Sequence, residues 1–361
     1  MNTEKQKIFV GISGGVDSSV AAYLLKKEGH EVHGVFIKTW SPEWVPCTWV
    51  DEKRDAMRVC AALDIPFHFL DAEAAYKDGV ADYMIDEYRA GRTPNPDVLC
   101  NRVIKFGVLW DYAKEEGADA IATGHYAQTD GVRLLRGADT SKDQSYFLWM
   151  LTKEELAHIR FPIGRLQKSE VRSIAERAGL FTAVKKDSQG VCFLGDVDMR
   201  EFLSYYIEEK KGAVVDERGA VIGEHDGVWF YTIGERHGFT ITAAGAAKVP
   251  HYVVGKEVEK NILVVSPRSP VAVSLEKTKK EHTEVLLRSP NWITAADKQH
   301  SYKVQIRYHG TPLTAKLHTD DKIEICSDGA LPLGQSLVVY DDTGVLVGGG
   351  IIDGVSPLSK K

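Results

Sequence analysis

The stretch that decides the fold runs from Lys7 to Ser19 and reads KIFVGISGGVDSS. Its first six residues form the apolar run of a short buried strand, and from Val16 apolar residues recur at helical spacing until Gly29. The glycine-containing segment Ser13–Ser18 therefore connects the end of a strand to the start of a helix. This connection predicts an α/β domain whose loop lies at the positive end of a helix.

The same alternation continues outward from this stretch through the first 125 residues. Strands that alternate with helices indicate an open, mostly parallel sheet, in which ligands bind beyond the carboxyl ends of the strands. Three loops leave such strand ends, at residues 13–18, 38–49 and 124–128. The expected strands are 32–37, 67–70 and 120–123, and the expected helices are 52–63, 73–89 and 105–116.

The pattern changes twice in the rest of the chain. Residues 153–210 are mostly helical, and after residue 212 short strand-like runs are separated by glycine-containing turns, which indicates small β-domains or a barrel. We predict an α/β domain at residues 1–158, a small mixed central domain at 159–222 and a C-terminal β-barrel domain at 223–361. The expected strands include 228–231, 302–308, 314–318, 322–326, 336–340 and 345–350.

Composition is that of a globular protein, and charge is distributed unevenly. The 361 residues are 43% hydrophobic and 27% charged, with a net charge of −6, which by itself does not favour a generally basic, nucleic-acid-binding surface. Residues 51–90 carry a net charge of −5, whereas residues 160–186 and 266–317 carry +5 each. The two basic stretches are candidate phosphate-binding surfaces, and the alternative is that they are solvated helix and loop faces.

The five cysteines form no C-x-x-C pair, so neither a zinc knuckle nor a disulfide scaffold is expected. No run of 18 apolar residues and no signal-like start is present, so we expect a cytoplasmic protein without membrane contact. Cys60 falls on the apolar face of a predicted helix and is expected in the core. No role is assigned to Cys47, Cys60 or Cys326, and the place of Cys47 in the fold stays open.

The glycine loop has the features of a phosphate site. Two adjacent glycines let backbone N–H groups approach an anion, and the serine hydroxyls add donors. Asp17 is well placed to hold a Mg²⁺ ion that neutralises a leaving pyrophosphate. The loop is neither a G-x-x-x-x-G-K-S/T loop nor a G-x-G-x-x-G fingerprint. The structural alternative is a simple glycine turn between a strand and a helix.

Two further strings place a thiol near polar or charged residues. In GRTPNPDVLCN (91–101) two prolines predict a rigid extended loop or turn that presents Asn95, Asp97 and Cys100, which suits an acid/base group paired with a nucleophile. In KKDSQGVCFLG (185–195) the two lysines favour a thiolate or persulfide anion at Cys192. The alternative for both cysteines is ordinary core packing.

Taken with other strings, these motifs resemble one family along nearly the whole chain. SGGVDSS is similar to the pyrophosphate loop of the N-type ATP pyrophosphatases (the PP-loop superfamily), and the ordered pair NPDVLC and GVCF is typical of the tRNA-specific 2-thiouridylases within it. The resemblance implies an adenine nucleotide alpha-hydrolase-like N-terminal domain and two tRNA-binding domains after it. The other matching strings are IATGHYA (121–127), LLRGADTSKDQSYFLW (134–149), QIRY (305–308), GQS (334–336) and GGGII (348–352).

The resemblance implies ATP-dependent adenylation of C2 of the wobble uridine (U34) of tRNA. Asp97 is then the acid/base group, and Asn95, Pro96 and Asp97 contact the flipped target base. The ATP-binding positions carried over are Gly11, Ile12, Ser13, Gly14, Gly15, Val16, Asp17, Ser18, Ile37 (often Met in the family) and Gly124. The tRNA-contact positions carried over are His125, Lys142, Asp143, Gln144, Arg307, Tyr308 and Gln335. For two of them a structural role stays open. Tyr308 is then a core residue of a strand, and His125 only caps the end of its strand.

The resemblance also implies that sulfur arrives as a persulfide on Cys192, from a sulfur-relay protein or a cysteine desulfurase. The persulfide either attacks the activated C2 directly or releases sulfide that attacks it. Cys100 attacks the persulfide, and a Cys100–Cys192 disulfide remains for reduction. Two other functions stay open on the residues alone. One is an amide-forming ATP pyrophosphatase, which needs no cysteine pair, and the other is a non-catalytic tRNA-binding module that has kept the nucleotide fold.

Overall fold

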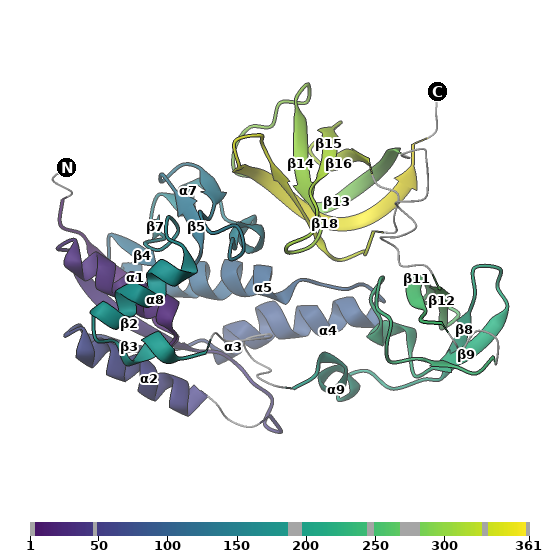
Figure 1. Cartoon of the computed structure of the whole chain (residues 1–361), viewed down its shortest axis with the longest axis horizontal. Helices are drawn as coiled ribbons and strands as arrows, with labels where there is room; N and C mark the ends of the chain where they lie inside the picture. The colour runs from purple at the N-terminus through teal and green to yellow at the C-terminus, as the bar shows by residue number, and fades with distance from the viewer. Residues whose placement is uncertain are drawn as a thin grey trace.

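The computed structural model describes residues 4–45, 49–186, 197–243, 249–267, 282–326 and 331–358. These residues form three sheets, one for each main part of the chain (Figure 1). Cys47 and Cys192 lie outside the described residues.

The N-terminal sheet is entirely parallel and has the strand order β3-β2-β1-β4-β7. Because β1 lies between β2 and β4, the order of the strands reverses there, and the loops that follow β1 and β4 lie next to each other at this reversal. The predicted α/β sheet is confirmed. The strands are β1 (Lys7–Gly11), β2 (Glu31–Lys38), β3 (Phe67–Asp71), β4 (Ala120–Ala122) and β7 (Ile159–Arg160).

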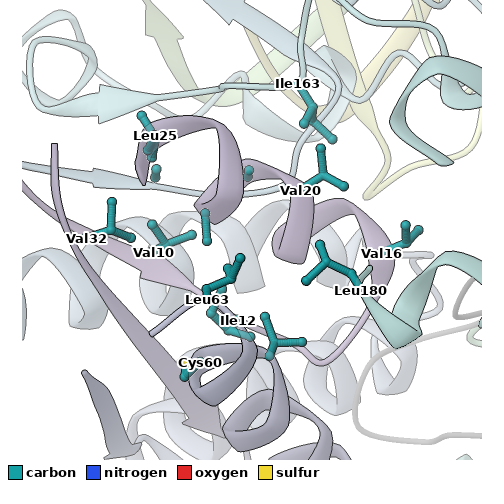
Figure 2. Packing of buried hydrophobic residues seen from close by; sticks show 14 of the residues in the cluster. Val10, Ile12, Val16, Val20, Leu25, Val32, Cys60, Leu63, Ile163 and Leu180 are labelled. Carbon is teal, nitrogen blue, oxygen red and sulfur yellow. The ribbon is translucent and has the colours of Figure 1, made fainter. Parts of the chain in front are cut away.

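Helices cover both faces of this sheet because the strands are apolar on both sides. Ile8 and Val10 face the helices α1, α2 and α8, whereas Phe9 faces the other way, toward α6. Figure 2 shows the first of these cores, with Val20 of α1 and Cys60 of α2 beside the strands, so Cys60 is a core residue as predicted. The helices are α1 (Val16–Lys27), α2 (Trp49–Ala62), α6 (Leu109–Glu115), α7 (Lys153–Leu156) and α8 (Lys168–Arg177), with 3₁₀ turns η3 (Ser145–Leu148) and η4 (Phe181–Val184).

Two long helical runs extend from this domain toward the other two (Figure 1). The first run joins α3 (Glu73–Tyr76), the π-helical η1 (Lys77–Ala81) and α4 (Asp82–Arg89), and the second joins α5 (Pro96–Leu99), the π-helical η2 (Cys100–Val108) and α6. The prediction of an extended loop throughout 91–101 is wrong after Asn95. Pro96 occupies the first helical position, where its fixed φ and missing N–H favour a helix start.

The central sheet has the order β10-β9-β8-β12-β11 and shares a core with the first helical run. The predicted strand at 228–231 is wrong, because Val228–Phe230 forms the 3₁₀ turn η5 that folds back after Gly227. The elements are α9 (Met199–Ser204), β8 (Gly212–Val215), β9 (Val221–His225), β10 (Thr240–Ile241), β11 (Tyr252–Glu257) and β12 (Ile262–Ser266).

The C-terminal sheet closes into a six-stranded antiparallel barrel, since β13 pairs with both β16 and β18. Strand β18 also pairs with β6, so the hairpin of β5 and β6, which lies between β4 and β7 in the chain, extends the barrel sheet. The predicted barrel is confirmed, and the strand expected at 302–308 ends at Gln305. The strands are β5 (Ala127–Thr129), β6 (Leu134–Arg136), β13 (His282–Trp292), β14 (Ser301–Gln305), β15 (Leu313–Leu317), β16 (Lys322–Cys326), β17 (Ser336–Tyr340) and β18 (Val345–Pro357).

Among the helices that the structure describes, none has the length and apolar character needed to cross a bilayer.

Candidate active site

The glycine loop curls between β1 and α1 and is held by its own serines. The Ser13 backbone N–H donates to Ser18 Oγ at 3.2 Å, and the Ser19 hydroxyl donates to the Gly15 carbonyl at 2.7 Å. Gly14 has φ +73°, and a Cβ there would lie 2.9 Å from the Asp55 Cβ. The loop therefore requires glycine at this position, and it leads directly into the N-terminus of α1.

Gly124 brings the loop after β4 onto the glycine loop. A Cβ on Gly124 would lie 2.6 Å from the backbone nitrogen of Ser18, so only glycine permits this approach. Of the predicted ATP-binding residues, Ile12 and Val16 have side chains in the hydrophobic core, which leaves only their backbone for a ligand. Ile37 is partly exposed at the end of β2.

Asp17, in the first turn of α1, has two partners that the sequence did not reveal. The Lys168 ammonium donates to both of its carboxylate oxygens at 2.8 Å, and the Tyr126 hydroxyl donates to Oδ1 at 2.8 Å. On the other side of the loop, the Lys185 ammonium donates to the Gly14 carbonyl at 3.1 Å and to Asp55 at 2.6 Å. Lys185, which we expected to act on Cys192, therefore contacts the glycine loop.

The segment that carries Asn95, Asp97 and Cys100 begins the second helical run. Asp97 and Cys100 are three residues apart at the start of that run, which puts them on one helix face. Burial raises the pKa of the Asp97 carboxyl above its ordinary value of 3.8, and the positive charge of Lys105 partly opposes this. A carboxyl with raised proton affinity suits acid/base chemistry near neutral pH. Cys100 is only 3% exposed.

A chain of neighbours links this helix to the glycine loop. His125 follows Gly124, lies 5.7 Å from the Phe106 ring between ring centroids, and its Nδ1 is 2.7 Å from Thr123 Oγ1. Burial, and then the charge of Lys105, holds the pKa of His125 well below its ordinary value of 6.5, so the imidazole is neutral. Lys105 thus acts on both His125 and the Asp97 carboxyl. The loop after β4 thus contacts both the glycine loop and the second helical run, the two elements that carry the predicted sites.

The barrel holds residues 91–101 in place, the segment predicted to contact the target base and called the target-base segment below. The Gln335 side-chain amide donates to the carbonyls of Thr93 and Pro94 at 2.9 and 3.1 Å, and the Thr93 backbone N–H donates to the Leu333 carbonyl at 2.9 Å. The Tyr146 hydroxyl donates to the Ser336 carbonyl at 3.0 Å. In the described structure Gln335 therefore positions backbone rather than pointing into solvent.

Glu87 makes a second connection that the sequence analysis missed. Its buried carboxylate accepts two hydrogen bonds from Arg92, at 2.8 and 2.6 Å, and one from Arg288 of β13 at 2.7 Å. This cluster joins α4, the target-base segment and the barrel. Arg92 lies inside the quoted GRTPNPDVLCN string, which was the available signal.

The other predicted tRNA contacts fall into two groups. The Asp143 carboxylate accepts from Arg136 at 2.9 Å, and Gln144 Oε1 accepts from the Tyr126 backbone N–H at 3.0 Å, so both side chains brace loops.

Arg307 and Tyr308 follow β14 and are exposed, and the Tyr308 ring lies 4.6 Å from Phe147 between centroids. Lys142, Asp143 and Gln144 belong to one turn near this pair. Between these elements a small polar recess is lined by Arg136, Thr140, Asp143, Tyr146, Gln305, Tyr308 and His309.

Comparison with known proteins identifies the family. Residues 6–196 match the family described as "tRNA methyl transferase HUP domain", and two later segments match its "PRC-barrel domain" (200–267) and an "Aminomethyltransferase beta-barrel domain" (282–352). The tRNA-specific 2-thiouridylase MnmA of Bacillus velezensis is 44% identical over 98% of this chain and 96% of that protein. The chain belongs to the tRNA-specific 2-thiouridylase family. Relatives of the same name from Streptococcus thermophilus (44% identical, 98% of this chain, 96% of that protein) and Geobacillus thermodenitrificans (43%, 97% and 95%) agree.

Solved structures match over about half of the chain. A 4-thiouridine synthetase in complex with RNA and ATP is 20% identical, covers 53% of this chain and 46% of its own, and has a TM-score of 0.35. The NMN synthetase from Francisella tularensis is 19% identical, covers 51% and 66%, and has a TM-score of 0.33.

Proposed function

We propose that this protein is a tRNA-uridine 2-sulfurtransferase that uses ATP to replace O2 of the wobble uridine with sulfur. The observation that carries the proposal is the 44% identity, over 98% of the chain, to proteins named as tRNA-specific 2-thiouridylases. The geometry supports it, because the loop after β4 contacts the glycine loop at Ser18 and the helical run of Asp97 and Cys100 at Phe106. The domain limits 1–158, 159–222 and 223–361 remain a prediction.

In the first step O2 of the uracil attacks the α-phosphorus of ATP, and the bond to pyrophosphate breaks. The backbone amides of the glycine loop would receive the leaving phosphates. Asp17 is the one loop carboxylate that could hold magnesium, but both of its oxygens accept hydrogen bonds from Lys168 and one accepts from Tyr126. A magnesium ion here would therefore take most of its ligands from phosphate and water, and it would neutralise phosphate charge. Within the described ranges no group of three or more His, Cys, Asp or Glu side chains is arranged to hold a metal by itself.

In the second step sulfur attacks C2 and AMP leaves with the former O2. Asn95 and Asp97 are proposed to contact the base, and Asp97 is the proposed acid/base group. The proposed sulfur carrier, Cys192, lies outside the described residues, and its donor would be a sulfur-relay protein or a cysteine desulfurase in the cytoplasm. Because Cys100 is 3% exposed, formation of a Cys100–Cys192 disulfide requires the persulfide to reach it inside the fold, or the helix to open.

The recess beside Tyr308 supports tRNA binding at this face. An unstacked base of a single-stranded loop can stack on an aromatic ring such as that of Tyr308. Arg307 precedes it in the chain, and its guanidinium donates to the Ile233 carbonyl at 2.7 Å. We propose that Lys142, Arg307 and Tyr308 contact the anticodon loop directly. Asp143, Gln144 and Gln335 would act by holding the backbone that forms this surface.

The proposal is tested by nucleoside mass spectrometry of tRNA incubated with the protein, ATP, Mg²⁺ and a persulfide-loaded donor. We expect 2-thiouridine at the wobble position of a U34 transcript and none on a matched C34 transcript. Cys100→Ser should abolish turnover, whereas Cys60→Ser, a change in the core of α2, should retain it. Thiolation that survives Cys100→Ser would overturn the proposed role of Cys100. AMP release without any thiolated nucleoside would overturn the proposed function in favour of another ATP-pyrophosphatase reaction.

A further inference from the structure

A tight turn between η5 and β10, formed by Thr232–Glu235 and called the central turn below, lies against the target-base segment. The Thr232 hydroxyl oxygen is 3.1 Å from that of Thr93, across 139 residues of chain. The two parts also meet at Gly91, where a Cβ would overlap the side chain of Val258. The central sheet and the target-base segment are therefore in close contact.

The central turn is held by its own hydrogen bonds. The Thr232 backbone N–H donates to Glu235 Oε2 at 2.9 Å, and the Glu235 N–H donates back to the Thr232 carbonyl at 3.0 Å. Backbone bonds to Val253 of β11, from the Gly234 N–H and to the Glu235 carbonyl, are both 2.8 Å long. Gly234 has φ +93°, a conformation that glycine adopts readily. The backbone that presents the Thr232 hydroxyl thus has little freedom to move.

Thr93 has each of its polar groups bound by a remote part of the chain. Its backbone N–H donates to the Leu333 carbonyl at 2.9 Å, and its carbonyl accepts from Gln335 at 2.9 Å. The hydroxyl pairs with that of Thr232. Because Thr93 is 8% exposed, a hydroxyl without this partner would be largely cut off from water, which costs free energy. The barrel and the central turn thus fix Thr93 from two sides.

Two prolines carry this restraint toward the proposed base contacts. Pro94 and Pro96 alternate with Thr93, Asn95 and Asp97 in the chain. A proline ring fixes its own φ and restricts the backbone of the residue before it. Few backbone torsions therefore remain free between Thr93 and the side chains of Asn95 and Asp97. Such precision matters for catalysis, since a misplacement of about 1 Å can cost about a hundredfold in rate.

The central turn also holds a proposed tRNA contact. The Arg307 guanidinium donates to the Ile233 carbonyl at 2.7 Å, and a Cβ on Gly234 would lie 3.4 Å from Arg307 Nη2. One turn therefore contacts both Arg307, on the surface proposed to bind the anticodon loop, and Thr93, in the segment proposed to bind the target base.

We propose that Thr232 is a positioning residue for thiolation, whose hydroxyl fixes Thr93 and thereby sets where Asn95 and Asp97 meet the target base. The inference rests on the proposed function and deepens it, because it gives the central turn a part in the reaction. Thr232 acts through Thr93 rather than on tRNA or ATP. Loss of its hydroxyl should therefore slow the reaction without weakening the binding of either substrate.

Kinetics of full-length variants test this role. Thr232→Val removes the hydroxyl and keeps the branched shape of the side chain. With a U34 transcript its kcat should fall about three- to tenfold, the value of one hydrogen bond between uncharged groups, while KM for ATP and for tRNA stays within about twofold. Thr232→Ser, which keeps a hydroxyl, should restore most of kcat. Thr240→Val, the same change at an exposed position of β10, is the matched control and should alter none of these values.

Thr93→Val breaks the same hydrogen bond from the other side, so the double variant shows whether the two hydroxyls act on each other. Each single variant should lower kcat, and the double variant should be no slower than the slower of the two. Losses that multiply in the double variant would overturn the inference, and so would an unchanged kcat in Thr232→Val or a loss seen only in KM. If Thr232→Val does not fold, an unchanged kcat in Thr93→Val decides against it.

Amide hydrogen exchange of the free protein, without tRNA or ATP, gives a readout that does not depend on thiolation. Peptides that span residues 95–101 should exchange at least about threefold faster in Thr232→Val than in wild type, and at the wild-type rate in Thr240→Val. Equal exchange in Thr232→Val and wild type would overturn the inference. Faster exchange in Thr232→Val, together with a wild type that makes no 2-thiouridine, would refute the proposed function and leave the hold on the segment established.

Discussion

Replacing Glu87 by Gln should loosen the connection between the barrel and the target-base segment. The Glu87 side chain is 5% exposed, whereas those of Arg92 and Arg288 are 29% and 34% exposed. Removing one partner of a buried ion pair costs about 3–5 kcal/mol. Because both arginines can regain water, we expect the lower part of that range, about 3 kcal/mol, in the free energy of the first unfolding transition.

The loss of stability in Glu87→Gln should depend on pH. Burial acts to raise the pKa of Glu87, but the hydrogen bonds and charges of Arg92 and Arg288 outweigh it and hold the pKa below the ordinary value of 4.5. A carboxyl with a lowered pKa contributes stability that is present above its unfolded pKa and is lost as the pH falls through its folded pKa. The difference in the free energy of unfolding between wild type and Glu87→Gln should therefore be constant above about pH 5.5 and become smaller below about pH 4.5.

Urea unfolding followed by tryptophan fluorescence, at a series of pH values, measures this difference. Asp86→Asn is the matched control, because Asp86 makes an exposed ion pair with Arg89 on the same helix, at 2.9 Å, and such pairs contribute about 0–1 kcal/mol. A loss below about 1 kcal/mol for Glu87→Gln at pH 7, or a difference that does not narrow in acid, would refute the reasoning.

Three other predictions concern the glycine loop, the buried thiol of Cys60 and the contact of Gln335 with the target-base segment. Gly14→Ala should weaken ATP binding and lower the free energy of unfolding by about 1–3 kcal/mol, because φ is +73° and a Cβ would press on α2. Gly29→Ala is the control and should cost less, because its φ is +94° but a Cβ there meets open space. Equilibrium dialysis measures ATP binding and urea unfolding measures stability for both variants. Burial raises the pKa of the Cys60 thiol to about 11, so at pH 8 iodoacetamide should label Cys326 well before Cys60, and peptide mass spectrometry that finds equal labelling contradicts this. Gln335→Ala removes two hydrogen bonds to the target-base segment and should lower kcat for thiolation about tenfold while leaving ATP binding unchanged; an unaltered kcat would show that the segment is held without it.

Much of the fold is readable from local patterns. The strand–loop–helix of Lys7–Ser19 and the alternation after it depend on residue periodicity, which a short window contains, and the parallel sheet follows from them. The failures are also local. Val228–Tyr231 has the apolar composition of a strand but folds as a turn after Gly227, and the proline-rich segment starts a helix at Pro96 because proline is favoured there.

The candidate site also has one part that the sequence reveals and one part that it does not. Motif strings name the groups that are proposed to carry chemistry, Asp97 and Cys100 among them, since reactive side chains in a distinctive order are a property of the sequence. The supporting partners are not visible there. Gln335 meets Thr93 across 242 residues of chain, and Arg288 meets Glu87 across 201.

The sequence by itself thus determined the fold class, the phosphate loop and the residues proposed for thiolation. Only the tertiary structure decided that Lys168 meets Asp17, that Lys185 contacts Gly14, and that the barrel holds the target-base segment through Gln335 and Arg288. Periodicity and residue chemistry are encoded within a few residues of each position. A contact between remote residues depends instead on how whole helices and sheets pack, which no short pattern contains.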